Sequence, residues 1–274
     1  MNSKQLMNEL KNGGRVYGTL IVSTSPRWPQ EVSKLDIDFV FLDAEHMALD
    51  RNLLSWMCQT YKAMNLAPIV RIPSPDPYQA SMALDGGASG IIAPYIETAE
   101  QVKALRAAVK LRPLKGQLAR RRADLQGQPS DPAEAELNEY IQEYNESNLL
   151  IVNIESVPAL EALDDILAVD QLDAVLIGPH DLSCSLGVPE QYRHPLFVEA
   201  VETIISKARA AGVAAGIHYF FGIDQEIQWA KAGLNLLVHA SDMTAFMARM
   251  SDEITEIKQA LGDPIRELHN RINI

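Results

Sequence analysis

The sequence predicts a single domain over residues 1–274 with an α/β fold, the (β/α)8 or TIM barrel, in which eight parallel strands alternate with covering helices. Short runs rich in Val, Ile and Leu recur along the chain, and each is followed by about ten to fifteen residues of helical periodicity. The length of 274 residues suits such a barrel. Gly-rich nucleotide-binding motifs, which would favour an open doubly wound sheet, do not occur.

The expected strands are the apolar runs themselves, because parallel strands are buried on both faces and lack polar alternation. In chain order they cover residues 17–22, 39–42, 68–70, 90–93, 149–154, 174–177, 214–217 and 235–238. Amphipathic periodicity predicts helices over residues 53–64, 99–109, 159–167, 195–210, 223–232 and 245–261. Eight such units fit a closed barrel better than an open sheet.

An insertion at about residues 111–147, after the fourth strand, interrupts this alternation of strands and helices. It is polar, carries three consecutive arginines at 120–122, and has a predicted helix over residues 132–144. In a barrel such an insertion lies on the C-terminal rim, where lids and subunit contacts are built. We expect the arginines to be solvated or paired across an interface, with a substrate clamp as the alternative.

Composition limits the classes of partner. The chain is 47% hydrophobic and 22% charged, without an apolar run long enough for a membrane span. Its net charge of -12 argues against nucleic acid and anionic membranes as partners. The start resembles no secretory signal, so we expect a cytoplasmic location. Cys58 and Cys184 are far apart and form no CxxC motif, which argues against a disulfide framework or a cysteine zinc site.

Ionisable residues follow the predicted strands where barrel active sites are built, at the C-terminal strand ends. We therefore expect them to converge on one mouth of the barrel. They are Asp43, Glu45 and His46 after the second strand, Arg71 after the third, Glu155 after the fifth, His180 and Asp181 after the sixth, His218 after the seventh and His239 after the eighth.

Glu155 and Asp181 come from adjacent strands, so their carboxylates could bind one hard divalent cation and leave positions open for water and substrate oxygens. Magnesium or manganese would suit such ligands. An ion pair between Glu155 and Arg71 is an alternative that the residues alone leave open. A histidine site for zinc is disfavoured, because the histidines lack the local helical spacing of zinc proteases.

His46 has carboxylate neighbours in Asp43 and Glu45, which could fix its tautomer and tune its pKa for general base catalysis. A rim histidine without a catalytic role is the alternative. Gly178 and Pro179, just ahead of Asp181, suggest backbone amides that approach a bound carboxylate, although a tight turn is the simpler explanation.

At these residues the chain resembles the HpcH/HpaI aldolase and citrate lyase family, over about residues 15–262. The resemblance is carried by five segments in the same order along the chain. They are FVFLDAEHMALD at 39–50, IVRIPSPDP at 69–77, LDGGASGIIAPYIETAEQV at 84–102, IVNIESVPALEALDDI at 151–166 and DAVLIGPHDLSCSLGVP at 173–189. The resemblance implies a barrel of the phosphoenolpyruvate/pyruvate-binding type and the activity of a metal-dependent class II pyruvate aldolase, a carbon-carbon lyase like 4-hydroxy-2-oxoheptanedioate aldolase.

The resemblance also implies roles for single residues. Glu155 and Asp181 match the family's metal ligands, and Arg71 matches the arginine that stabilises the enolate oxygen of pyruvate. His46 with Asp85 matches an acid/base dyad.

Further positions belong to the same site by resemblance. Asp43 lies in the motif near the metal-bound water, and the segment of Gly178, Pro179, His180 and Asp181 matches the one whose backbone amides hold the pyruvate carboxylate. Asn153 stands where the aldolases usually have a glutamine, and would contact substrate. His180 replaces a small residue and Leu118 replaces an arginine of the family, which leaves the aldehyde specificity open.

The activity implied is cleavage or formation of a carbon-carbon bond between pyruvate, as its enolate, and an aldehyde, with a 4-hydroxy-2-oxo acid on the other side of the reaction. The partners implied are a small 2-keto acid and an aldehyde, with magnesium or manganese as cofactor and cobalt or zinc as alternatives. The resemblance implies a homo-oligomer, a hexamer or trimer formed by exchange of the last helix. Alternative functions are a citrate-lyase-like lyase acting on a coenzyme A thioester and a barrel subunit without catalysis.

Overall fold

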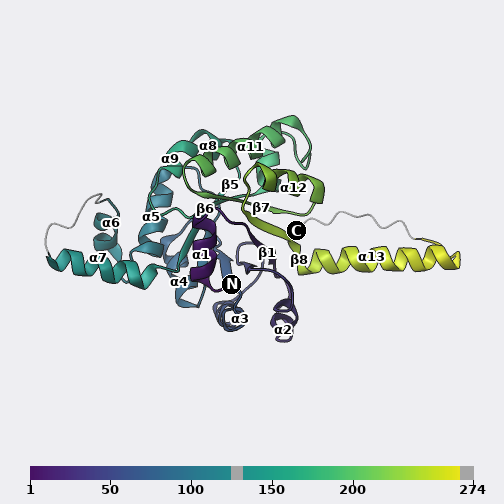
Figure 1. The fold of residues 1–274 in the computed structure, drawn as a ribbon, viewed down its shortest axis with the longest axis horizontal. Coiled ribbons are helices and arrows are strands. Elements are labelled where there is room, and N and C mark those ends of the chain that lie inside the picture. Colours follow the sequence, from purple (N-terminus) through teal and green to yellow (C-terminus); the bar gives the residue numbers. More distant parts are fainter. Residues whose placement is uncertain (125–131, 266–274) are drawn as a thin grey trace.

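The computed structural model describes residues 1–124 and 132–265, and shows a closed barrel of eight parallel strands, which confirms the predicted fold (Figure 1). Each strand pairs with the next in chain order, and β8 pairs with β1 to close the ring. The strands are β1 (Val16–Leu20), β2 (Phe39–Asp43), β3 (Ala67–Arg71), β4 (Gly90–Ala93), β5 (Leu149–Ile154), β6 (Ala174–Ile177), β7 (Ala214–Tyr219) and β8 (Leu236–Ser241).

Helices surround the strands and extend beyond them on two sides (Figure 1). Within the described residues they are α1 (Ser3–Lys11), α2 (Trp28–Val32), α3 (Arg51–Ala63), α4 (Pro77–Asp85), α5 (Ala99–Lys110), α6 (Gly116–Asp124), α7 (Pro132–Asn145), α8 (Val157–Glu161), α9 (Leu163–Leu167), α10 (Pro179–Ser185), α11 (Pro195–Ala210), α12 (Ile223–Ala232) and α13 (Asp242–Leu261). None of them is long and apolar enough to cross a membrane.

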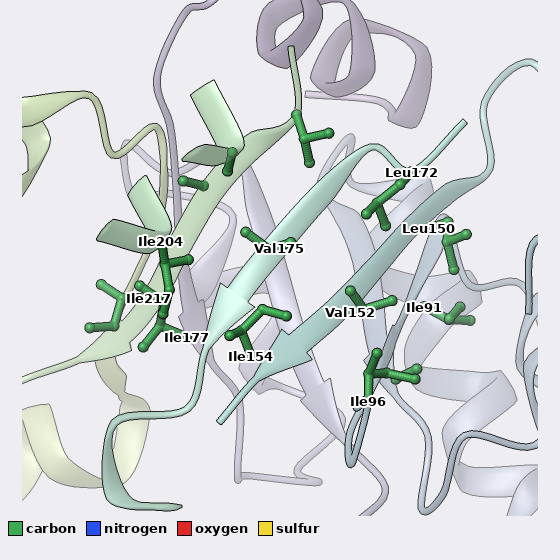
Figure 2. Packing of buried hydrophobic residues seen from close by; sticks show 14 of the residues in the cluster. Ile91, Ile96, Leu150, Val152, Ile154, Leu172, Val175, Ile177, Ile204 and Ile217 are labelled. Atoms are coloured by element: carbon green, nitrogen blue, oxygen red, sulfur yellow. The ribbon is translucent and has the colours of Figure 1, made fainter. Parts of the chain in front are cut away.

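Alternation along the strands divides the apolar residues into two layers. Phe39 and Phe41 belong to the cluster that fills the barrel interior, whereas Val40 and Leu42 belong to the layer between strands and helices. Figure 2 shows part of this outer layer, where Val152 of β5 and other side chains of the same layer pack together. Because both faces of each strand are covered, the strands are continuous apolar runs, and this is why their positions could be predicted closely.

The predicted helix over residues 159–167 is two short helices, α8 and α9, which meet at Ala162. Short helices α2, α4 and α10 were not predicted, because none is long enough to show a periodic apolar face. Proline occupies the first turn of each of the three and supports helix initiation there.

The insertion contains α6 and α7, and α7 agrees with the helix predicted over residues 132–144. The expected position on the C-terminal rim was wrong, because the insertion follows α5 and leads into the start of β5, which places it toward the N-terminal end of the strands. A small cluster of Ala107, Leu111, Ala119 and Ile141 packs both helices against α5. Of the arginine triplet, Arg121 is exposed and Arg122 donates a hydrogen bond to Asn138 within the insertion.

A buried ion pair lies at the end of the barrel opposite the strand C-termini, the end that α1 closes with Leu6 and Leu10. Lys110, the last residue of α5, pairs with Asp173, which precedes β6, and both side chains are only 7% exposed. Lys110 also donates to the carbonyl of Asn148, and Asp173 accepts from the amide of Leu150. Burial lowers the pKa of Lys110, although the charge of Asp173 opposes that shift.

Removing the lysine should therefore leave a buried carboxylate without its cation. We expect Lys110→Ala to lower the free energy of unfolding in urea by about 3–5 kcal/mol. The matched control is Lys103→Ala on the same helix, whose side chain is 48% exposed, and it should change stability by no more than about 0.5 kcal/mol. Equal effects of the two substitutions would show that the buried pair does not stabilise the barrel in this way.

Candidate active site

Two strand ends at the barrel mouth carry an arginine held by carboxylates. Asp43 and Arg71 are register partners at the ends of β2 and β3. Arg71 donates through Nε to Asp43 Oδ1 at 2.9 Å and through Nη2 to Asp43 Oδ2 at 2.6 Å. Burial acts to raise the pKa of Asp43, but the hydrogen bonds and charge of Arg71 outweigh it, so that pKa is lowered. Asp43 is thus ionised and fixes the guanidinium plane.

Arg71 also lies beside Glu45, whose Oε2 is 3.0 Å from Arg71 Nε. That oxygen is buried and accepts no hydrogen bond, because the Nε–H points to Asp43. Among the described residues Arg71 makes no ion pair with Glu155, so the pairing left open by the sequence does not form in this structure.

Glu155 follows β5 and is only 6% exposed. Its Oε1 accepts the amide of Tyr95 at 2.8 Å, and its Oε2 accepts Asn153 Nδ2 at 2.7 Å. Burial raises the pKa of Glu155, and the negative charges of Asp181 and Glu45 raise it further against those hydrogen bonds. A Cβ on Gly178 would lie 2.7 Å from Glu155 Oε2, so glycine allows the end of β6 to approach this carboxylate.

Asp181 lies in the first turn of α10 and is exposed at the mouth. Within residues 1–124 and 132–265 no group of three or more His, Cys, Asp or Glu side chains is arranged to hold a metal ion. The donor set nevertheless suits magnesium or manganese, since such ions are often held by one or two carboxylates and keep the remaining positions for water and substrate. The buried Asn153 Oδ1 also lacks a hydrogen-bond partner here.

Tyr95, in the loop after β4, connects two of these carboxylates. Its backbone has a φ of 56°, in the left-handed region, and this conformation accompanies the donation of its amide to Glu155. Hydrogen bonding to Glu45, followed by burial and the charges of Glu155 and Asp181, raises the pKa of its phenol to about 12. A left-handed non-glycine residue costs about 1–3 kcal/mol, and such strain is concentrated at functional sites. Sequence reasoning gave Tyr95 no role.

The structure does not bring together the proposed pair of His46 and Asp85. His46 is 54% exposed at the mouth, with Nε2 3.9 Å from Glu45 Oε1. Asp85 ends α4 and forms an ion pair with Arg112. Since α4 leads from the end of β3 to the start of β4, Asp85 lies toward the opposite end of the barrel. No hydrogen bond or ion pair joins the two residues in the described part of the chain.

Gly178, Pro179 and His180 form the start of α10 beside Asp181. Gly178 is the N-cap residue, and the exposed His180 uses its carbonyl to accept Ser183 Oγ at 2.7 Å. Leu118 lies on α6 with its side chain 57% exposed.

His218, on β7, points into the barrel interior, where its ring meets the edge of Phe41 at 5.7 Å. Its Nε2 lies 3.0 Å from the carbonyl of Ala240, which can only accept, so Nε2 carries the proton. Burial lowers the pKa of His218 to about 4, and the charge of Arg71 acts in the same direction. The side chain is therefore a neutral imidazole of fixed tautomer at neutral pH.

His239 departs from the expectation that all of these groups meet at the mouth. It occupies an exposed position in β8, on the outer wall of the barrel, and pairs with Glu226 of α12 at 2.8 Å. The prediction was wrong because β8 continues past Val238 to Ser241, and the residue after an inward-facing position points to the opposite face.

Comparisons with known proteins agree with this architecture. The chain is 32% identical over 219 residues to the 2-keto-3-deoxy-L-rhamnonate aldolase of Salmonella gallinarum (strain 287/91 / NCTC 13346), covering 78% of each chain. It is 29% identical to the 2-dehydro-3,6-dideoxy-6-sulfogluconate aldolase of Pseudomonas putida, covering 91% of this chain and 95% of that one. The crystal structure of an HpcH/HpaI aldolase from Desulfitobacterium hafniense DCB-2 superposes with a TM-score of 0.79 at 28% identity, covering 92% and 96% of the two chains.

The family model described as HpcH/HpaI aldolase/citrate lyase matches residues 17–248, which includes every strand of the barrel except the first residue of β1. The resemblance expected from the sequence motifs is confirmed, and the chain belongs to the HpcH/HpaI aldolase/citrate lyase family.

Proposed function

We propose that this protein is a metal-dependent aldolase that cleaves 4-hydroxy-2-oxo acids to pyruvate and an aldehyde, or forms them in the reverse direction. The observation that carries the proposal is the environment of Glu155, a buried carboxylate whose ionisation is opposed by burial and by the charges of Asp181 and Glu45. A divalent cation between Glu155 and Asp181 would offset this repulsion. The similarity to aldolases at 29% and 32% identity favours this function over a coenzyme A thioester lyase or an inactive barrel.

In this proposal Glu155 and Asp181 hold magnesium or manganese, with cobalt or zinc as alternatives. The bound cation would supply Lewis acidity toward the keto oxygen and carboxylate of the substrate. In the segment Gly178, Pro179 and His180, the N–H groups of Gly178 and His180 would donate to the substrate carboxylate, since proline has none, and Asn153, two residues before Glu155, would contact the substrate.

Arg71 has the clearest role among the residues that act on developing charge. When the bond between C3 and C4 of the substrate breaks, its electron pair passes to C3 and the enolate oxygen becomes negative. The Arg71 guanidinium, already oriented by Asp43, stabilises that oxygen. Because the arginine is fixed before the reaction, little reorganisation is required of it.

His46 is the proposed base. It removes the proton of the 4-hydroxyl, so that the aldehyde carbonyl forms as the carbon-carbon bond breaks, and the enolate is then protonated at C3 to give pyruvate. An Asp85 partner for His46 would have to come from a second copy of the chain, since the two residues are not joined within one chain.

A second copy is also favoured by the exposed face of α13, which extends away from the barrel in Figure 1. This face carries Met243, Phe246, Met247, Met250, Ile254, Ile257 and Leu261, each more than 40% exposed. An apolar groove beside it, lined in part by Tyr17, Trp28, Ile223 and Leu237, follows the outer wall at β1 and β8. We propose a homo-oligomer, a hexamer or trimer, in which α13 of one copy covers this wall of another. The cytoplasmic location stays a prediction.

The function is tested by exchange of the methyl protons of pyruvate for deuterium, followed by NMR with added magnesium or manganese and again with chelator. Exchange that requires metal and needs no coenzyme A would support enolate chemistry. No exchange under either condition would overturn the proposal.

Arg71→Ala should lower the rate of this exchange and of aldol cleavage by about 100-fold or more, because one group that stabilises the enolate oxygen is removed. The substitution also leaves Asp43 without its partner, so the melting temperature is measured alongside and rates are compared per folded protein. Arg193→Ala, at an exposed ion pair with Asp224, is the control. Retained activity in Arg71→Ala would contradict the role of this arginine.

Glu155→Gln should weaken binding of manganese by at least about tenfold, because a charged ligand is lost. Calorimetry with manganese alone measures this without reference to activity. Glu161→Gln, at an exposed position on α8, should leave the affinity unchanged. Equal affinity of the Glu155 variant and the unaltered protein would show that Glu155 is not a metal ligand.

Phe246→Glu should reduce the native mass in solution, because it places a charge on the exposed face of α13, where Phe246 is 58% exposed. Light scattering measures the mass, and Glu253→Gln on the same helix is the control. An unaltered protein that is already monomeric would overturn the proposed assembly.

A further inference from the structure

Four rings extend from the barrel interior to the rim on the β7 side of the mouth. His218 and Phe220 are two residues apart, so they face the same side, and their ring centroids are 6.2 Å apart. Phe221 stacks on Phe220 at 4.1 Å and on Tyr192 at 4.2 Å. We call His218, Phe220, Phe221 and Tyr192 the ring series.

The ring series has a buried support. Tyr192 is 8% exposed and meets Phe197 and Tyr219 edge to face at 5.5 and 5.9 Å. The Tyr219 hydroxyl donates to Gln225 Oε1 at 2.8 Å, and Gln225 Nε2 donates to the Tyr192 carbonyl at 2.6 Å. These contacts hold Tyr192 in place, and they also hold Phe221, which stacks on Tyr192. Phe221 is stacked between Phe220 and Tyr192 and nevertheless remains 43% exposed, so it presents a fixed ring edge just beyond the C-terminal end of β7.

Both ends of the ring series lie next to the proposed reaction centre. At the inner end, His218 and the Arg71 guanidinium both contact Phe41, at 5.7 and 5.4 Å. At the outer end, Tyr192 lies in the segment that follows α10, the helix that carries Asp181. The residues proposed to hold pyruvate come from β2, β3 and the segments after β5 and β6, so the ring series on β7 is the neighbouring part of the mouth.

We propose that the ring series binds the aldehyde half of the substrate, and that this half carries an aromatic ring or a comparable flat unsaturated group. The inference rests on the proposed aldolase function and specifies its substrate class. A polyhydroxylated chain would need a hydrogen-bond partner for each hydroxyl, whereas Phe220 and Phe221 offer only apolar ring atoms, and His218 there is neutral. Rings held in place favour edge-to-face contact with a substrate ring, because little conformational freedom is lost on binding.

The test compares retro-aldol cleavage of three pyruvate adducts, formed with benzaldehyde, acetaldehyde and glyceraldehyde, in metal-containing buffer. We expect kcat/KM to be highest for the benzaldehyde adduct. Phe221→Ala should lower kcat/KM for that adduct by about tenfold and leave the acetaldehyde adduct within about twofold. For the benzaldehyde adduct, Phe221→Leu should give a kcat/KM between those of the unaltered protein and Phe221→Ala, since leucine keeps apolar area without a ring. Tyr140→Ala, which removes an exposed ring on α7, is the matched control.

Methyl proton exchange of pyruvate is measured on the same variants. Because exchange involves no aldehyde, it tests the aldolase function separately from the proposed aldehyde site. If exchange is intact but the glyceraldehyde adduct is preferred, or Phe221→Ala slows all three adducts equally, the ring series is not the aldehyde site and the aldolase function stands. If the unaltered protein catalyses no exchange, the proposed function fails and this inference fails with it.

Discussion

The buried carboxylate of Glu155 is the group around which the barrel mouth is arranged. Removing a carboxylate from water is costly unless its oxygens find donors, and here each oxygen has one, from the Tyr95 amide and from Asn153. Those donors have structural consequences of their own. Tyr95 adopts a left-handed backbone conformation, and the lack of a Cβ at Gly178 leaves room for the carboxylate. Much of the local geometry therefore follows from placing one charge at this depth.

The balance of charge at the mouth follows from the same constraint. Asp43, Glu45, Glu155 and Asp181 gather there around Arg71. Among these five side chains one cation faces four carboxylates, so the group is negative and would repel an anionic 2-keto acid. A divalent cation changes that balance. The need for positive charge before an anionic substrate can bind is therefore a property of these side chains, independent of the identity of the aldehyde.

The sequence sufficed to predict most of the fold, because strands buried on both faces leave continuous apolar runs. It also placed Glu155, Asp181 and Arg71 together, since barrel sites are built at strand ends. Three features could not be predicted, each for a physical reason. Tyr95 acts through its backbone conformation, which depends on a carboxylate distant in the sequence. His239 faces outward because β8 is longer than its apolar run. Asp85 ends α4 and pairs with Arg112, away from His46, because α4 leads to the opposite end of the barrel.

Buried polar groups at the two ends of the barrel differ in whether they have partners within the chain. This difference indicates which groups stabilise the fold and which are available to bind a ligand. At the closed end Lys110 and Asp173 are matched one to one and are further bonded to backbone groups, so neither requires a ligand. At the mouth Glu45 Oε2 and Asn153 Oδ1 are buried without a hydrogen-bond partner. Buried polar atoms in native proteins usually have partners, and exceptions often mark a place where a ligand or water supplies one. The Lys110–Asp173 pair is complete without a ligand and stabilises the fold, whereas Glu45 Oε2 and Asn153 Oδ1 at the mouth are placed to gain a partner from water or from a bound substrate.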